Sequence, residues 1–434
     1  MKMKKLVCMV VAFTLTATSL IGCGSSGGDS KSQGGADSSG KTTLKMAVWD
    51  KDKTAYLQPV IDAYEAKNSN VDIEILDISS AEYQDKLSVM LSGGSDDIDI
   101  ITVKDTPGYS SMVNKNQLEP LDSYISKDSV KLDSYSGTAD QLKVNDKLYA
   151  LPFRNDFWVL YYNKDIFDKA GIAYPTNDMT WSQYEELAKK LASGDGANRV
   201  YGTHDHTWRS TVQLPAVLDG KNTMIQKDYS FLKPYYEMAL RMQNDKIMMD
   251  YASLKTGSIH YSGVFENNQT AMLPMGTWFM GQLMADKTKG TTNVNWGIVK
   301  YPHADGVKPG ATIGTITSLA VNSKSSKKDA AWDFIKFFTG QDGAATVAGT
   351  GTLPAIKSAD VINTITAQKG FPTDEGSKKA LETEKTYLEM PVNTKCSAVE
   401  TILNEEHDLI MTRSTSVDDG LKEMGERVSE ELAK

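Results

Sequence analysis

Four tryptophans stand near the ends of predicted strands or turns, where a side chain can meet a ligand. Trp49 ends the first predicted strand, Trp158 lies near the start of another, Trp208 closes a His-Asp-His-Thr-Trp loop, and Trp278 follows a Met-Gly-Thr turn. The C–H face of a sugar ring packs against an aromatic ring, and nearby Asp, Arg and Asn side chains can bond its hydroxyls. The set predicts carbohydrate binding, although a single tryptophan is more often part of a hydrophobic core.

We also searched the sequence for the motifs of metal-binding, nucleotide-binding and hydrolytic sites. The sequence has no CxxC or HExxH pattern, and outside the Gly- and Ser-rich residues 22–42 it has no Walker loop, GxGxxG or GxSxG pattern, so we expect no cofactor, no metal and no catalysis. His204 and His206 form the only close histidine pair, and we interpret them as polar loop residues that line a cleft. Trp296 and Trp332 are assigned to the core. Glycoside hydrolysis by two carboxylates is the one enzymatic alternative left open.

The first residues have the pattern of an export signal. Three lysines within the first five residues precede an apolar run from residue 6 to residue 21, which is too short for a stable membrane span. Residues 20–23, Leu-Ile-Gly-Cys, resemble the bacterial lipobox, in which a cysteine is lipidated after cleavage just before it. We therefore predict a lipoprotein signal peptide over residues 1–22. A lipid on Cys23 would anchor the protein to the extracellular face of the bacterial cytoplasmic membrane.

The rest of the chain has the composition of a large globular protein. Residues 23–41 are rich in Gly and Ser and are predicted to form a flexible tether. The mature chain of 434 − 22 = 412 residues favours two lobes. Cys396 is left without a partner for an intrachain disulfide. The net charge of −9 argues against a nucleic-acid surface, which needs clustered Lys and Arg.

Strand and helix patterns alternate after the tether, which implies a parallel sheet with covered faces. A second series of elements starts between residues 150 and 155 and indicates a second lobe. Thr180 opens a helix with capping-box spacing, Gly340 ends another, and Ser416 caps the last one. The predicted strands cover residues 44–49, 71–75, 98–103, 157–162 and 318–322.

Stretches of sequence spread from residue 44 to residue 432 carry a resemblance to a known family. In order they are LKMAVWD (44–50), SGGSDDIDII (92–101), LYALPFRNDFWVLYYNKDIFDKAGI (148–172), TWSQYEELA (180–188), TAMLPMGTWFMGQL (270–283), TSLAVNSKSSKKDAAWDFIKFFTG (317–340) and TSVDDGLKEMGERVSEEL (415–432). Together they resemble the family 1 extracellular solute-binding proteins of ATP-binding-cassette (ABC) sugar importers, the group that includes maltose-binding protein. Any one stretch would be weak, but the set in this order is specific.

The resemblance implies a type II periplasmic-binding-protein fold, an α/β architecture of two lobes joined by a hinge of crossing strands. The first lobe would comprise residues 42–150 plus 311–355, and the second 151–310 plus 356–434. The implied function is that of a monomeric extracellular receptor that delivers a sugar or oligosaccharide to the permease subunits of an ABC importer by hinge closure.

The same resemblance assigns candidate ligand-binding residues. Asp156 matches a cleft carboxylate, Trp278 matches the stacking tryptophan of a Gly-x-Trp turn, and Asp105 matches a hydroxyl-binding aspartate. Trp49 and Asp50 lie where family members make contacts from the first strand. These residues join the aromatic set as the implied binding site.

The sequence also departs from the family near its end. Glu400 stands where the maltose receptor has another stacking tryptophan, and Asn404 replaces an arginine. We therefore expect a sugar that is not bound as maltose is, and its identity stays open. Glu400 is kept with Trp158, Trp208 and Arg154 among the ligand-binding candidates.

Three alternatives remain. The ligand could be another polar solute, such as a polyol, a sugar phosphate or a peptide, although a phosphate would need several cations and only Arg154 and Arg209 are well placed. A lipid-anchored glycosidase would use Asp156 and one partner carboxylate. A structural surface lipoprotein would bind no ligand.

Overall fold

The computed structural model describes residues 40–93, 97–356, 358–383 and 385–434, so the predicted signal peptide, Cys23 and nearly all of the tether lie outside the described part. Its strands are β1 (Thr42–Trp49), β2 (Val71–Ile78), β3 (Ile100–Val103), β4 (Leu151–Asn163), β5 (Met272–Gly276), β6 (Trp296–Lys300), β7 (Ala311–Val321) and β8 (Lys385–Leu388). They form one mixed sheet in the order β2-β1-β3-β7-β4-β5, with β6 beside β4 and β8 beside β7.

The first three strands confirm the predicted parallel arrangement. β1 pairs in parallel with both β2 and β3, and the connecting helices are α1 (Leu57–Lys67) and α2 (Tyr83–Ser92). α1 buries Leu57, Val60, Ile61 and Tyr64, the i, i+3, i+4, i+7 face of an amphipathic helix. The carboxyl ends of β1 and β3 therefore lie at the same edge of the sheet, where ligands bind in open α/β folds.

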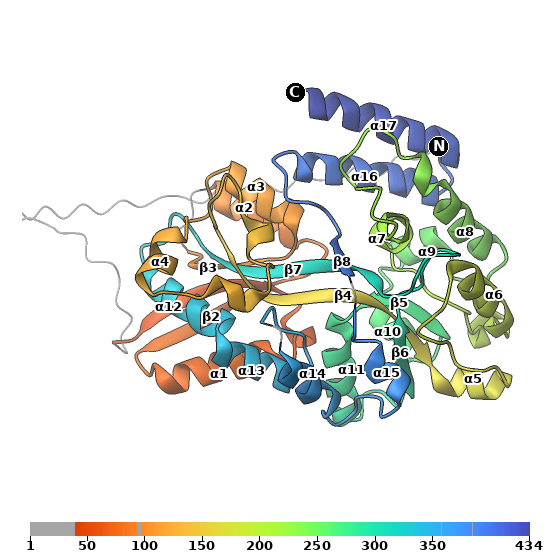
Figure 1. Cartoon of the computed structure of the whole chain (residues 1–434), viewed down its shortest axis with the longest axis horizontal. Coiled ribbons are helices and arrows are strands. Elements are labelled where there is room, and N and C mark those ends of the chain that lie inside the picture. The colour runs from red at the N-terminus through yellow and green to blue at the C-terminus, as the bar shows by residue number, and fades with distance from the viewer. Residues whose placement is uncertain (1–39, 94–96, 357, 384) are drawn as a thin grey trace, which may run out of the picture.

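Two long strands, β4 and β7, cross between the halves of the molecule (Figure 1). They pair antiparallel with each other from Leu151 opposite Leu319 to Phe157 opposite Gly314. Beyond that segment β4 pairs with β5 and β6 in one half, while β7 pairs with β3 in the other. The register shifts between Pro152 and Arg154, a bulge of the kind that bends a strand and redirects a side chain.

Helices cover both faces of the sheet (Figure 1). The capping box at Thr180 and the cap at Ser416 are present as predicted. Among the described residues, none of the helices is both long and apolar enough to cross a membrane. The remaining α-helices are α3 (Thr106–Asn114), α4 (Asp122–Lys127), α5 (Lys164–Ala170), α6 (Trp181–Leu191), α7 (Ser210–Gln213), α8 (Lys233–Asn244), α9 (Tyr251–Thr256), α10 (Tyr261–Glu266), α11 (Trp278–Lys289), α12 (Lys328–Thr339), α13 (Gln341–Gly349), α14 (Ala359–Thr366), α15 (Glu375–Lys379), α16 (Cys396–Met411) and α17 (Val417–Ala433).

Separate hydrophobic clusters lie in the two halves. One large cluster draws its residues from 44–153 and 316–347, and two others draw theirs from between residues 157 and 428. Trp332 belongs to the first cluster and Trp296 to the third, and both are buried, as predicted. Cys396 is a buried free thiol. The fold thus consists of two packed lobes that share the crossing strands.

Candidate ligand-binding site

A cavity of about 290 Å³ is lined by both lobes, close to the lower end of the usual size range for small-molecule pockets. Its wall includes every predicted binding residue except Asp156. Those residues are Trp49, Asp50, Asp105, Arg154, Trp158, Trp208, Trp278 and Glu400. Positions far apart in the sequence are thus brought to one place.

The first-lobe wall is formed where β1 and β3 end. Asp50, directly after β1, accepts a hydrogen bond of 2.9 Å from the backbone of Ser80. Lys104 donates to the carbonyl of Ser80 at 2.9 Å, and its ammonium lies 5.7 Å from the ring centroid of Trp49. Asp105 caps α3 by accepting from the Gly108 amide at 2.8 Å. This wall presents charged side chains beside the half-buried ring of Trp49.

The second-lobe wall is mainly aromatic. The ring of Trp278 meets the rings of Trp158 and Trp208 edge to face, with centroids 5.7 and 6.2 Å apart, and its Nε1 donates to Tyr261 at 3.2 Å. Trp158 is only 1% exposed and forms the base of the cluster. Trp208 and Trp278 are half-buried and therefore have surface left for a ligand.

Gly276 explains the turn that holds Trp278. A Cβ atom at residue 276 would lie 2.0 Å from Cζ3 of Trp278, which is far inside van der Waals contact. The indole ring thus lies flat against the end of β5, and only glycine leaves room for it. The Gly-x-Trp spacing in the sequence is therefore explained by the clash that any side chain at residue 276 would make with the indole ring.

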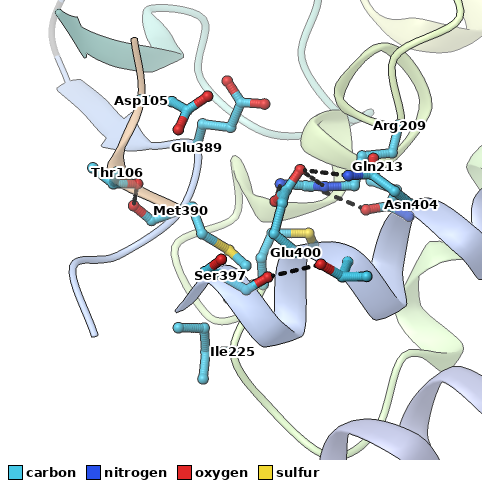
Figure 2. Close-up of polar contacts among 12 residues, drawn as sticks. Asp105, Thr106, Arg209, Gln213, Ile225, Glu389, Met390, Ser397, Glu400 and Asn404 are labelled. Atoms are coloured by element: carbon cyan, nitrogen blue, oxygen red, sulfur yellow. Dashed lines mark hydrogen bonds and ion pairs between the residues drawn. The ribbon is translucent and has the colours of Figure 1, made fainter. Parts of the chain in front are cut away.

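One end of the cavity contains an ion pair between α16 and the start of α7. Arg209 donates from Nε to Glu400 at 2.9 Å, contacts its second oxygen through Nη2, and donates from Nη1 to Gln213 at 3.1 Å. Asn404 donates to Glu400 at 3.1 Å. Figure 2 shows this network around the Glu400 carboxylate. The two sequence departures from the family therefore form one network with Arg209.

Glu389 and Asp105 lie near this ion pair (Figure 2). Thr315 of β7 donates to Glu389 at 3.0 Å. Burial raises the pKa of Glu389 to about 7; Arg209 opposes the rise, while the charges of Glu400 and Asp105 add to it. Burial also raises the pKa of Asp105. These groups give this end of the cavity several hydrogen-bond acceptors.

Arg154 and Asp156 occupy the crossing strand β4. Arg154 lines the cavity, whereas Asp156 is 1% exposed and lies behind it. Their ion pair joins Arg154 Nε to Asp156 Oδ2 at 2.6 Å. Burial raises the pKa of Asp156, and Arg154 and Thr277 oppose that rise. The structure thus separates two residues that the sequence had placed together as ligand contacts.

The histidine pair requires a correction. His204 and His206 were expected to line the cleft but are not among the residues that line this cavity. The ring of His206 packs 4.6 Å from Trp208 and 5.3 Å from Tyr261, measured between centroids. His260, which the sequence did not single out, lines the cavity instead. No group of three or more His, Cys, Asp or Glu side chains within the described ranges is arranged to hold a metal ion.

Several cavity residues escaped the sequence reasoning. Lys104 could have been found, because it precedes Asp105 at the carboxyl end of a predicted parallel strand. Lys53, Tyr56 and Tyr261 come from segments without a motif, and Glu389 reaches the cavity only through the pairing of β8 with β7. Their positions depend on tertiary structure.

Comparisons with known proteins agree with this architecture. A lactose-binding protein from Rhizobium radiobacter is 22% identical over 68% of this chain and 69% of its own length. A sugar transporter from Rhizobium etli, solved in an open conformation, is 54% identical with a TM-score of 0.73, over 89% of this chain and 99% of its own.

An ABC substrate-binding protein from Listeria monocytogenes, solved with cycloalternan, has a TM-score of 0.76 at 24% identity, over 91% of this chain and 99% of its own. This likeness supports the two-lobed type II fold. The model of the bacterial extracellular solute-binding protein family, which consists of binding proteins and not of enzymes, matches residues 50–345. Since that match covers more than half of the sequence, the chain belongs to this family.

Proposed function

We propose that this protein is the carbohydrate-binding receptor of an ABC importer and captures a neutral sugar or short oligosaccharide between its lobes. The observation that carries the proposal is the cavity itself, in which half-buried tryptophans face a wall of hydrogen-bonding groups. Aromatic faces and paired donors and acceptors are what a sugar ring requires. The Rhizobium etli protein, named a sugar transporter, supports the same class of ligand.

The charges of the cavity favour a neutral ligand over a phosphate. Its cationic residues are Lys53, Lys104, Arg154 and Arg209, and its acidic residues are Asp50, Asp105, Glu389 and Glu400. Both arginines already pair with carboxylates, so neither offers the free guanidinium that binds a phosphate well. A sugar phosphate is therefore the weaker candidate.

A glycosidase is also disfavoured. Its proposed carboxylate, Asp156, pairs with Arg154 and does not face the cavity. A hydrolase needs both carboxyl groups beside the scissile bond. Binding without reaction fits the observed arrangement better.

A thermal-shift panel tests the proposed function. D-tagatose, lactose, maltose and mannobiose are compared with glycerol 3-phosphate, and the sugars are checked for turnover. A sugar present at about 100 times its dissociation constant should stabilise the fold by about 2.7 kcal/mol. Stabilisation by glycerol 3-phosphate alone, or hydrolysis of a sugar, would reject the proposal.

We further propose that the lobes are residues 42–150 plus 311–355 and 151–310 plus 356–434, with a hinge near residues 151–155 and 308–314. The first hydrophobic cluster, from residues 44–153 and 316–347, supports the first lobe in outline, while Ile313, Ala348 and Leu353 pack with the clusters of the second lobe. The bulge between Pro152 and Arg154 supports the hinge, because a bulge weakens the local ladder and eases bending.

Hinge closure predicts a change in shape. A saturating sugar should reduce the radius of gyration measured by small-angle scattering, since closure brings the two lobes together around the ligand. The non-binding members of the panel serve as controls. An unchanged profile at saturation would contradict hinge closure.

We also propose that a lipid on Cys23 anchors the receptor outside the cell, where its permease partner would receive the sugar. The lipobox-like residues 20–23 support this proposal. Cys23→Ser should move the protein from the membrane fraction to the soluble fraction without changing its melting temperature. Cys396→Ser is the control and should leave the fractionation unchanged. Continued association of Cys23→Ser with membranes would argue against lipidation.

A further inference from the structure

A chain of buried polar groups runs from the wall of the cavity to Asp156 and Thr277 and connects the two lobes. Thr277, at the N-terminus of α11, donates to Asp156 Oδ1 at 2.8 Å. Asp156 Oδ2 pairs with Arg154 Nε at 2.6 Å. The other guanidinium nitrogens of Arg154 donate to Tyr56 of the first lobe and to Thr317 of β7, both at 3.2 Å.

Neither oxygen of Asp156 reaches the cavity, because the side chain is buried and is not among the residues that line it. One oxygen faces Arg154 and the other faces Thr277, and the side chain is 1% exposed. A buried carboxylate is costly without partners, so these contacts should persist in the ligand-free protein. Arg154, by contrast, lines the cavity from the bulge in β4.

Thr277 extends the influence of Asp156 to the aromatic wall. Its hydroxyl also accepts a hydrogen bond from the Phe157 amide at 3.2 Å, and the next residue is Trp278. The carboxylate therefore contacts the residue that directly precedes α11 as well as the arginine on the crossing strand.

We propose that Asp156 is a positioning residue, which orients the Arg154 guanidinium in the cavity and, through Thr277, the indole of Trp278. Asp156 then acts on ligand binding without contact with the ligand. The effect on affinity rests on the proposed function, whereas the orientation of Arg154 does not.

The orientation can be tested without a ligand, by modification of arginines with phenylglyoxal and peptide mass spectrometry. Asp156→Asn should speed modification of Arg154 several-fold, because its ion pair is lost. Arg241 pairs at the surface with Glu185, far along the chain from this network, and provides an internal control with an unchanged rate. Thr277→Val keeps the carboxylate but removes its second donor, and should give a smaller increase. An unchanged rate for Arg154 in both variants would overturn the proposal.

Affinity gives a second test, in which each panel sugar is titrated into single and double variants. Asp156→Asn keeps an oxygen that can accept from Thr277, so it removes only the action through Arg154. Arg154→Met with Asp156→Asn should therefore bind no more weakly than Arg154→Met alone. If the affinity loss of the double variant equals the product of the losses of the two single variants, Asp156 contacts the sugar independently of Arg154, and the proposal is overturned. If no panel sugar binds the wild-type protein, the proposed function fails, while the modification rates still decide the role of Asp156.

Discussion

Replacing Arg209 with methionine is expected to lower the free energy of unfolding of the ligand-free protein by about 3–5 kcal/mol. Arg209 is 2% exposed and bonds both oxygens of Glu400. Its loss leaves Glu400 without its cation, close to Asp105 and Glu389, which already repel it. Urea unfolding at neutral pH measures the effect.

Arg241→Met is the matched control, because the pair of Arg241 with Glu185 lies at the surface, with side chains 54% and 29% exposed. Such pairs contribute about 0–1 kcal/mol. If Arg209→Met lowers the free energy of unfolding no more than Arg241→Met does, the Arg209–Glu400 pair is not needed for stability.

The Arg209 effect should also depend on pH. The pKa of Glu389 is about 7 in the folded protein, above its usual value, so charging Glu389 reduces stability as the pH rises through about 7. Arg209 opposes that cost. The free energy of unfolding that Arg209→Met loses relative to the wild type should therefore be larger at pH ~8 than at pH ~6. Equal losses at the two pH values would contradict the coupling between Arg209 and Glu389.

The second large effect contrasts two tryptophans. Trp296→Ala should cost about 3–5 kcal/mol of stability, because it leaves a cavity in the core. Trp278→Ala should cost the ligand-free fold much less, since its ring is only half-buried. It should instead weaken sugar binding by a stacking contribution of about 0.5–1.5 kcal/mol plus the apolar area covered.

Melting curves without sugar and titration calorimetry with the best-binding panel sugar distinguish these outcomes. Trp296→Ala controls for general loss of aromatic volume in the second lobe. A Trp278→Ala protein that melts as low as Trp296→Ala but keeps its sugar affinity would place Trp278 in the core and remove it from the site.

Much of the fold could be predicted from local patterns, because strands and helix caps have short-range signals. The strand predictions failed where the signal is not local. The strand expected at residues 157–162 begins at Leu151, and the one expected at 318–322 begins at Ala311. The missing parts contain polar and small residues, such as Asp156 opposite Thr315. These residues become strand because the two crossing segments pair with each other.

The site was predictable where it lies at strand ends. Trp49 ends β1 and Asp105 follows β3. The carboxyl ends of these strands meet at one edge of the sheet, so the positions of the two residues in the sequence were enough to indicate them. Asp156 shows the limit of such reasoning, because neither spacing nor resemblance reveals that its side chain points behind Arg154. Glu389 follows a four-residue strand that forms only against β7, and so had no local signal.

The crossing strands also set the order in which the chain can fold during its synthesis. β3 and β4 are not neighbours in the sheet, because β7 lies between them. A growing chain that has reached residue 310 therefore still lacks the strand that joins β3 to β4, and α12, which packs in the first-lobe cluster, comes later still. Such non-local pairing slows folding. Neither lobe can be completed alone, and a fragment ending before β7 should be prone to aggregation, because β3 and β4 would each keep an unpaired edge.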